Sequence, residues 1–259
     1  MSAAPPVPPG ELTFFEHLNE LRSRMMRACL GVLPAIALVW IFKEACLEAL
    51  VGPLVSAWKA QGLGAPRLHF QTPVEPIVAY LKIAALGGIV LASPWVFWQL
   101  WAFVAPGLLP AERRFALPFT VASSLCFIGG VCFAYWVVFP LGFETFLAFS
   151  GMLPGGSLTL EPTLMLDAYL TFVLRLLLAF GVVFEVPVVV FFLAVSGMVS
   201  PKALLGFSRW WILVATLLAA ALTPPDVASQ LLMLVPLILL YFASIGIAWL
   251  VTRKRNKSA

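Results

Sequence analysis

The sequence has few charged residues. Only 11% of its 259 residues are Asp, Glu, Lys or Arg, against about 25% in a soluble domain, and 62% are hydrophobic. The mean hydropathy is +1.01. These values exclude an ordinary soluble domain and indicate a polytopic membrane protein. The net charge of +4 does not predict nucleic-acid binding, because the location of Lys and Arg matters more than their sum in a membrane protein.

The sequence also lacks the residue sets of a catalytic or metal centre. Its two histidines, His17 and His69, are predicted on opposite sides of the membrane and cannot share a metal. The four cysteines show neither a zinc spacing nor a disulfide framework. No Gly-rich phosphate loop and no convincing Ser/His/Asp or Cys/His set is present. We therefore expect no enzymatic activity, no metal and no cofactor.

The apolar segments predict an all-α protein with six transmembrane helices. A straight span needs about 20 residues, and the fifth run is clearly shorter. The fifth and sixth runs are separated by the tight turn at 223–226, where Pro224 and Asp226 are expected to act as turn formers. The first run follows no cleavable signal peptide and should remain in the membrane. The six runs are 25–41, 78–104, 115–139, 168–195, 210–222 and 227–251.

The two ends of the chain differ from this membrane domain. Residues 1–12 are rich in proline and are expected to be disordered. Residues 13–16 resemble a capping box, and the residues that follow alternate between an apolar and a charged face. We expect a short amphipathic helix that lies at the interface and runs into the first span. Residues 13–251 then form the membrane domain, and 252–259 a basic tail.

The distribution of Lys and Arg predicts the orientation. Eleven basic residues fall at 22–27, 113–114, 202–209 and 253–257, whereas the opposite loops carry only Lys43, Lys59 and Arg67. The positive-inside rule places both termini in the cytoplasm. The first outside loop, about 42–76, has room for a short helix, and its four prolines, Pro53 among them, are expected to break it into pieces.

Three acidic residues lie beside or inside apolar sequence. Glu20 and Glu112 are predicted at the inner interface, where two carboxylates suit two arginine side chains. Spacing alone favours a structural explanation, in which Glu20 pairs with Arg24 at i,i+4 and Glu112 caps a helix or neutralises its neighbours. Glu185 lies inside the fourth span. It is either a hydrogen-bonded structural carboxyl or a polar contact for a partner helix, a proton relay or a water-lined cavity, and the functional alternatives are favoured.

Arg175, in the same span as Glu185, is too far along the helix to pair with it directly, about 15 Å. It is expected either to meet Asp167 or to extend outward to the interface.

Six ordered segments between residues 13 and 251 together resemble the TatC family, the multispanning core of the twin-arginine protein translocase. They are HLNELRSR at 17–24, QLWAFVAPGL at 99–108, ERR at 112–114, FP at 139–140, FEVP at 184–187 and LTPPD at 222–226.

The resemblance implies recognition of a twin-arginine signal peptide on a folded cargo protein. Glu20 and Glu112 would contact the two arginines, with Arg22 and Arg114 shaping the site and Phe103 beside it. Glu185 would lie in a concave face where the signal peptide or a single-span TatA- or TatB-like helix docks. The short fifth and sixth spans would thin the bilayer there.

The resemblance also implies a location in the bacterial inner membrane, self-association in a larger complex, and transport driven by the proton-motive force. The main alternative is a proton-coupled secondary transporter that uses Glu185. Transporters often contain repeated halves with broken helices at corresponding positions, and the sequence shows no such repeat.

Overall fold

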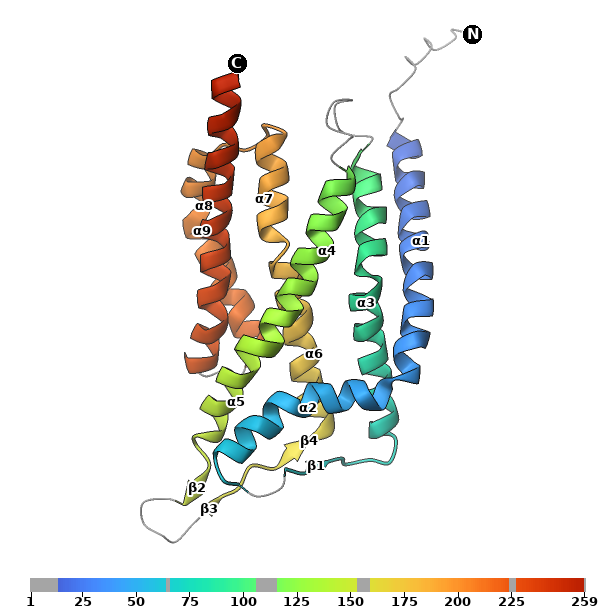
Figure 1. The fold of residues 1–259 in the computed structure, drawn as a ribbon, viewed down its shortest axis with the longest axis vertical. Helices are drawn as coiled ribbons and strands as arrows, with labels where there is room; N and C mark the ends of the chain where they lie inside the picture. Colours follow the sequence, from blue (N-terminus) through green and yellow to red (C-terminus); the bar gives the residue numbers. More distant parts are fainter. Residues whose placement is uncertain (1–13, 64–65, 106–115, 153–158, 224–226, 259) are drawn as a thin grey trace.

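The computed structural model describes residues 14–63, 66–105, 116–152, 159–223 and 227–258. Its elements follow one another as α1 (Phe14–Ile41), α2 (Lys43–Ala60), β1 (Leu68–His69), α3 (Glu75–Val104), α4 (Ala116–Phe133), the π-helical turn η3 (Ala134–Val138), α5 (Phe139–Leu147), β2 (Gly151–Met152), β3 (Thr159–Leu160), β4 (Leu164–Met165), α6 (Leu166–Val183), α7 (Val186–Val195), α8 (Pro201–Leu222) and α9 (Val227–Ser258). The long helices run roughly side by side, and α2 crosses beneath them (Figure 1).

Six membrane spans are confirmed within the described chain. Five segments are long and apolar enough to cross a bilayer, and the bent helix α3 is the sixth. The α8 and α9 segments measure 22 and 21 residues, against 27 to 31 for the other three of these five segments. The fifth and sixth spans are therefore the shortest, as expected. Helix α8 nevertheless begins nine residues before its apolar run, because Ser200 caps it by accepting from the Ala203 amide at 3.2 Å.

The N-terminal amphipathic segment forms the first turns of α1. Residues 14–41 make one helix without a break, so the segment continues the span and does not turn away from it (Figure 1). The predicted tail at residues 1–12 lies outside the described residues. At the other end α9 continues to Ser258, so residues 252–258 extend the sixth helix.

Two of the spans are interrupted at proline. Helix α3 bends by 54° between Leu91 and Ser93. Pro94 has no amide to offer the Val90 carbonyl, and the Ser93 hydroxyl donates to that oxygen at 2.8 Å instead. The fourth span breaks into α6 and α7 at Glu185, two residues before Pro187. Both interruptions leave backbone groups that other polar groups must satisfy inside an apolar environment.

Pro53 does not act as the turn that was expected. It lies inside α2, which continues from Lys43 to Ala60. A proline at this position leaves the Ala49 carbonyl without its helical donor. The Tyr135 hydroxyl donates to that carbonyl at 2.7 Å, and the Tyr169 hydroxyl donates to the Leu50 carbonyl at 2.8 Å. Tertiary hydrogen bonds thus preserve the helix. The other predicted turn residues, Pro224 and Asp226, lie outside the described residues.

The ends of α3 and α6 that lie near α2 are joined by reciprocal contacts. The Glu75 carboxylate of α3 accepts from the Asp167 amide at 2.9 Å, which caps the start of α6. In return the Asp167 carboxylate of α6 pairs with Lys82 of α3. Strands β1 and β4, which precede these helices, pair in parallel, with Leu68 opposite Leu164. Asp167 is therefore paired with Lys82 and not with Arg175. Arg175 is exposed, in agreement with the alternative expectation that it extends outward.

Helix α6 lies at the centre of the main core. Its residues Leu170, Val173 and Phe180 are fully buried, and they pack with Phe139 of α5 and with α2, α3 and α9. This core occupies the half of the bundle that contains α2 and the short strands (Figure 1). The opposite half is held by two smaller clusters, one around Trp101 and one around Tyr241.

Candidate functional site

Helices α1 and α3 pack closely, and this packing positions the predicted inner-face residues. A side chain at Gly88 would collide with the backbone of Ile36 in α1. The indole Nε1 of Trp95 in α3 donates to the Arg27 carbonyl of α1 at 2.9 Å. The two helices are thereby fixed along most of their length, and the first turns of α1 lie against the last turns of α3.

A small polar and aromatic cluster forms where these ends meet. We call it the α1–α3 patch: His17, Glu20 and Arg24 of α1 with Gln99 and Phe103 of α3. The His17 ring stacks on Phe103 with centroids 4.5 Å apart. Arg24 Nη2 lies 3.4 Å from Glu20 Oε1, and Arg24 Nη1 donates to Gln99 Oε1 at 3.5 Å. Both distances are at the long end for charge-assisted bonds.

The patch combines a carboxylate with a flat apolar surface. The Glu20 side chain is 23% exposed and its partner Arg24 27%. A second guanidinium can therefore reach the carboxylate, which has acceptor positions for more than one donor. Arg22 is exposed on the same helix and has no ion pair among the described residues. Such an arrangement can hold a cationic side chain and support its alkyl stem on the His17 and Phe103 rings.

Glu185 opens onto a separate groove. The groove lies between α7, α8 and α9, has a volume of about 620 Å³ and is lined mainly by apolar side chains, with Trp211 and Tyr241 also in its lining. Glu185 Oε1 is buried and has no hydrogen-bond partner among the described residues. An apolar groove with one carboxyl group in its lining fits a helix that carries a polar group at a defined depth.

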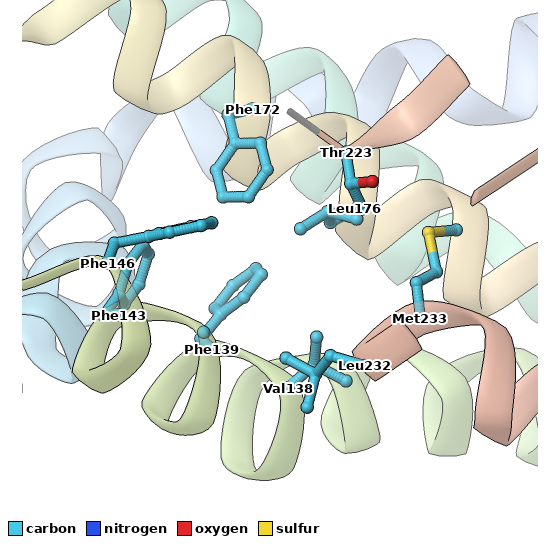
Figure 2. A pocket seen from close by; sticks show the side chains of 10 residues that line it. Val138, Phe139, Phe143, Phe146, Phe172, Leu176, Thr223, Leu232 and Met233 are labelled. Carbon is cyan, nitrogen blue, oxygen red and sulfur yellow. The ribbon is translucent and has the colours of Figure 1, made fainter. Parts of the chain in front are cut away.

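A small cavity in the half of the bundle that contains α2 carries no such chemistry. It holds only about 20 Å³ between α5, α6 and α9. Figure 2 shows that phenylalanine rings surround it, among them Phe139 and Phe146 from α5 and Phe172 from α6, with Thr223 at one side. This space contributes to packing and is too small for an organic ligand.

Comparison with known proteins places this fold and site in a family. The family model for Sec-independent protein translocase protein (TatC) matches residues 16–236. The chain belongs to the TatC family. A TatC of Desulforapulum autotrophicum is 40% identical over 232 residues, which cover 90% of this chain and 82% of the relative. A TatC of Aquifex aeolicus is 34% identical over 244 residues, which cover 93% and 97%.

A solved structure shares the TatC architecture. It is described as a crystal structure of the twin-arginine translocase receptor TatC, and it matches with a TM-score of 0.79 and 34% identity. The match covers 91% of this chain and 99% of the other. The resemblance inferred from the six sequence segments is therefore confirmed. Membership in the TatC family argues against the alternative of a secondary transporter.

The structure describes only part of the predicted recognition site of this TatC protein. Glu20 and Arg22 lie near the start of α1 and Phe103 near the end of α3, whereas Glu112 and Arg114 lie outside the described residues. The local Glu20–Arg24 pair expected from spacing is present. It is long and partly exposed, so it is compatible with recruitment of Glu20 by a ligand.

Two residues with clear structural roles were missed from the sequence. Gln99 is 4% exposed and accepts a hydrogen bond from Arg24. In the sequence it stands out only as part of the segment at 99–108. Lys82 lies inside the second apolar run, away from the loops whose charges indicate the orientation. A lone lysine in a span requires an acidic partner. Asp167, at the start of the fourth span, is an acidic residue that the sequence offers as the partner of Lys82.

Proposed function

We propose that this chain is the receptor and core subunit of a twin-arginine translocase, which binds twin-arginine signal peptides at the inner face. The main structural support for this proposal is the α1–α3 patch. There a partly exposed Glu20 carboxylate lies beside the stacked rings of His17 and Phe103. The TatC relatives and the solved receptor structure support the same role. Glu112 and Arg114 supply the second half of the site in this proposal.

The groove beside Glu185 is the docking surface for a single-span TatA- or TatB-like partner in this proposal. Its volume of about 620 Å³ and its apolar walls suit one helix. A polar group on that helix would satisfy Glu185 Oε1, whose desolvation otherwise costs free energy. The receptor works without catalysing a reaction, and the proton-motive force drives transport through the assembled complex.

The proposed location is the bacterial inner membrane with both termini in the cytoplasm. Six spans return the chain to its starting side, and the start of α1 and the end of α9 lie at the same end of the bundle (Figure 1). The basic residues near both ends agree with this orientation. Self-association in a larger complex completes the proposal.

Peptide binding tests the recognition site. The purified protein in nanodiscs is titrated with a twin-arginine signal peptide and with its twin-lysine version. Because hydrogen bonds to charged groups contribute about 1.5–3 kcal/mol, Glu20→Gln should weaken twin-arginine binding by about 10- to 100-fold. Glu48→Gln is the matched control, since Glu48 is exposed on α2 at the opposite end of the bundle. Equal affinity of Glu20→Gln and wild type would remove Glu20 from the site.

A further inference from the structure

Another groove lies beside α2, and we call it the α2 groove. Its volume is about 450 Å³, within the range of about 300–1,000 Å³ that is typical of ligand pockets. Residues of α1, α2, α3, α4, η3 and α6 line it, and nearly all of them are apolar. None of them belongs to the α1–α3 patch or to the groove beside Glu185.

The α2 groove is about as deep as one leaflet of a bilayer. Along α3 its lining runs from Ile83 to Leu91, and eight residues of helix measure about 12 Å. One half of the hydrocarbon core measures about 15 Å. At one end Cys46 and Leu50 of α2 line the groove, and α2 crosses beneath the long helices there (Figure 1). A partner helix that spans the membrane would collide with α2, whereas a single acyl chain has the right length.

The turn η3 holds α2 in place at this groove. The Tyr135 hydroxyl donates to the Ala49 carbonyl at 2.7 Å, and both residues line the groove. The next residue, Trp136, also lines it and is 68% exposed. A π-helical turn inside a helix is frequent at functional sites. The groove is therefore preformed between fixed helices and open at its surface.

Lys43 supplies a positive charge near the groove. It lies one turn before Cys46 on the same side of α2. It is half-buried, and its ammonium nitrogen lies 5.4 Å from the ring centroid of Trp40 and 5.7 Å from that of Tyr80. It forms no ion pair with any residue that the structure describes. An ammonium group without a carboxylate partner is available for a lipid phosphate, and Trp and Tyr rings suit the headgroup level of a membrane.

The acidic residues near Lys43 on α2 lie away from the groove. Glu44 and Glu48 are each two residues from Cys46, which places them about 160° around the helix, and both are exposed. Lys43 is three residues from Cys46, only about 60° around the helix. The charge of α2 that lies nearest to the groove is therefore positive.

We propose that the α2 groove binds an acyl chain of a phospholipid and that Lys43 selects a phospholipid with an anionic headgroup. The chain lies against the apolar side chains between Ile83 and Leu91, and the phosphate lies beside the ammonium group. The bound lipid fills the space between α2 and the long helices and stabilises their packing. The site belongs to the leaflet nearest α2 and does not depend on signal-peptide binding.

Photo-crosslinking on the full chain tests the selection of the headgroup. Phosphatidylcholine nanodiscs contain a trace of phosphatidylglycerol or phosphatidylcholine that carries a diazirine on its acyl chain. The phosphatidylglycerol probe should give more adducts at residues 83–91 and 131–136 than the phosphatidylcholine probe. Lys43→Gln should reduce this preference about fivefold, the contribution of one lysine near a membrane surface.

Lys59→Gln is the matched control for Lys43→Gln. Lys59 is exposed near the opposite end of α2, so its loss should leave the preference unchanged. Equal adducts of the two probes in wild type, or an unchanged preference in Lys43→Gln, would overturn the selection by Lys43.

Two variants that fill the groove test its occupant. Ala49→Phe fills it from α2 and Leu91→Trp from α3, and both residues are exposed, so the core is left intact. Each variant should abolish the adducts in the groove, while adducts at Leu217 of α8, which is 62% exposed, stay as in wild type. Wild-type adducts in both variants would place the acyl chain elsewhere and overturn the proposal. Absence of groove adducts in wild type, as expected if a second copy of the chain or a peptide occupies the space, would also overturn it.

Discussion

The two ends of the bundle are built differently. At the end that contains α2, which the proposed orientation makes the outer end, Glu75 caps α6, Lys82 pairs with Asp167, and two tyrosine hydroxyls hold the backbone of α2 at 2.7 and 2.8 Å. At the opposite, inner end lies the α1–α3 patch, whose His17 and Phe103 rings stack and whose two polar contacts measure 3.4 and 3.5 Å. The polar contacts of the outer end are short, and those within the patch are long.

This difference separates stability from recognition. Short bonds and a dense core around α6 make the outer half the part that maintains the fold. The inner patch keeps a carboxylate and two rings accessible, and these gain partners only when a ligand arrives. A binding site generally retains polar groups that contribute little to folding. Substitutions at the two ends should therefore affect different measurements.

The largest expected effect is loss of stability in the outer core. Phe180 is fully buried in α6, and Phe180→Ala should lower the free energy of unfolding by about 3–5 kcal/mol. Phe149→Ala is the control, because Phe149 is 77% exposed and its loss should change stability by less than about 0.5 kcal/mol. Equilibrium unfolding in detergent measures both. Similar stabilities for the two variants would contradict the assignment of the core.

A smaller loss of stability is expected when the contacts of Lys82 in α3 with Asp167 and Thr171 in α6 are broken. Lys82→Met leaves Asp167 without its cation, and the Thr171 hydroxyl, which accepts from Lys82 at 3.0 Å, also loses its donor. The side chains are 36% and 48% exposed, so the cost should be only about 1–2 kcal/mol.

The double variant Lys82→Met/Asp167→Asn checks the origin of this loss. Removal of both charges should recover part of the stability, because the unpaired carboxylate is gone. Strictly additive losses in unfolding experiments would show that the pair does not contribute as a unit.

The smallest effect on stability is expected in the inner patch. Glu20→Gln breaks one partly exposed ion pair of 3.4 Å, and the free energy of unfolding should fall by less than about 1 kcal/mol. The same unfolding assay measures it. A loss as large as that of Phe180→Ala would make Glu20 a residue of the fold, and the separation of the two ends would not hold.

The sequence predicts the spans well because each depends on local hydropathy. It also anticipates the Glu20–Arg24 pair, which follows from spacing on one helix. The role of Pro53 was not predictable in this way. A proline normally ends a helix, and here tyrosines of η3 and α6, distant in sequence, donate to carbonyls of α2 beside it.

Contacts between spans are the part that one sequence does not specify. Nothing local indicates that Gln99 receives Arg24 or that Trp101 donates to Ser123, because these pairs are separated by 75 and 22 residues. The break at Glu185 is intermediate: Pro187 indicates an interruption, but the groove that Glu185 lines between α7, α8 and α9 follows only from the packing. Predictability therefore decreases as the number of packed helices that define a feature increases.

A double-mutant cycle between Glu20 and the signal peptide tests the central claim most directly. Wild type and Glu20→Gln are each titrated with a twin-arginine peptide and with peptides in which one arginine is replaced by citrulline, which has the same shape without the charge. Direct contact predicts a coupling energy of about 1.5–3 kcal/mol for one of the two arginines and almost none for the other. Additive losses at both arginines would contradict recognition of the twin-arginine pair by the α1–α3 patch.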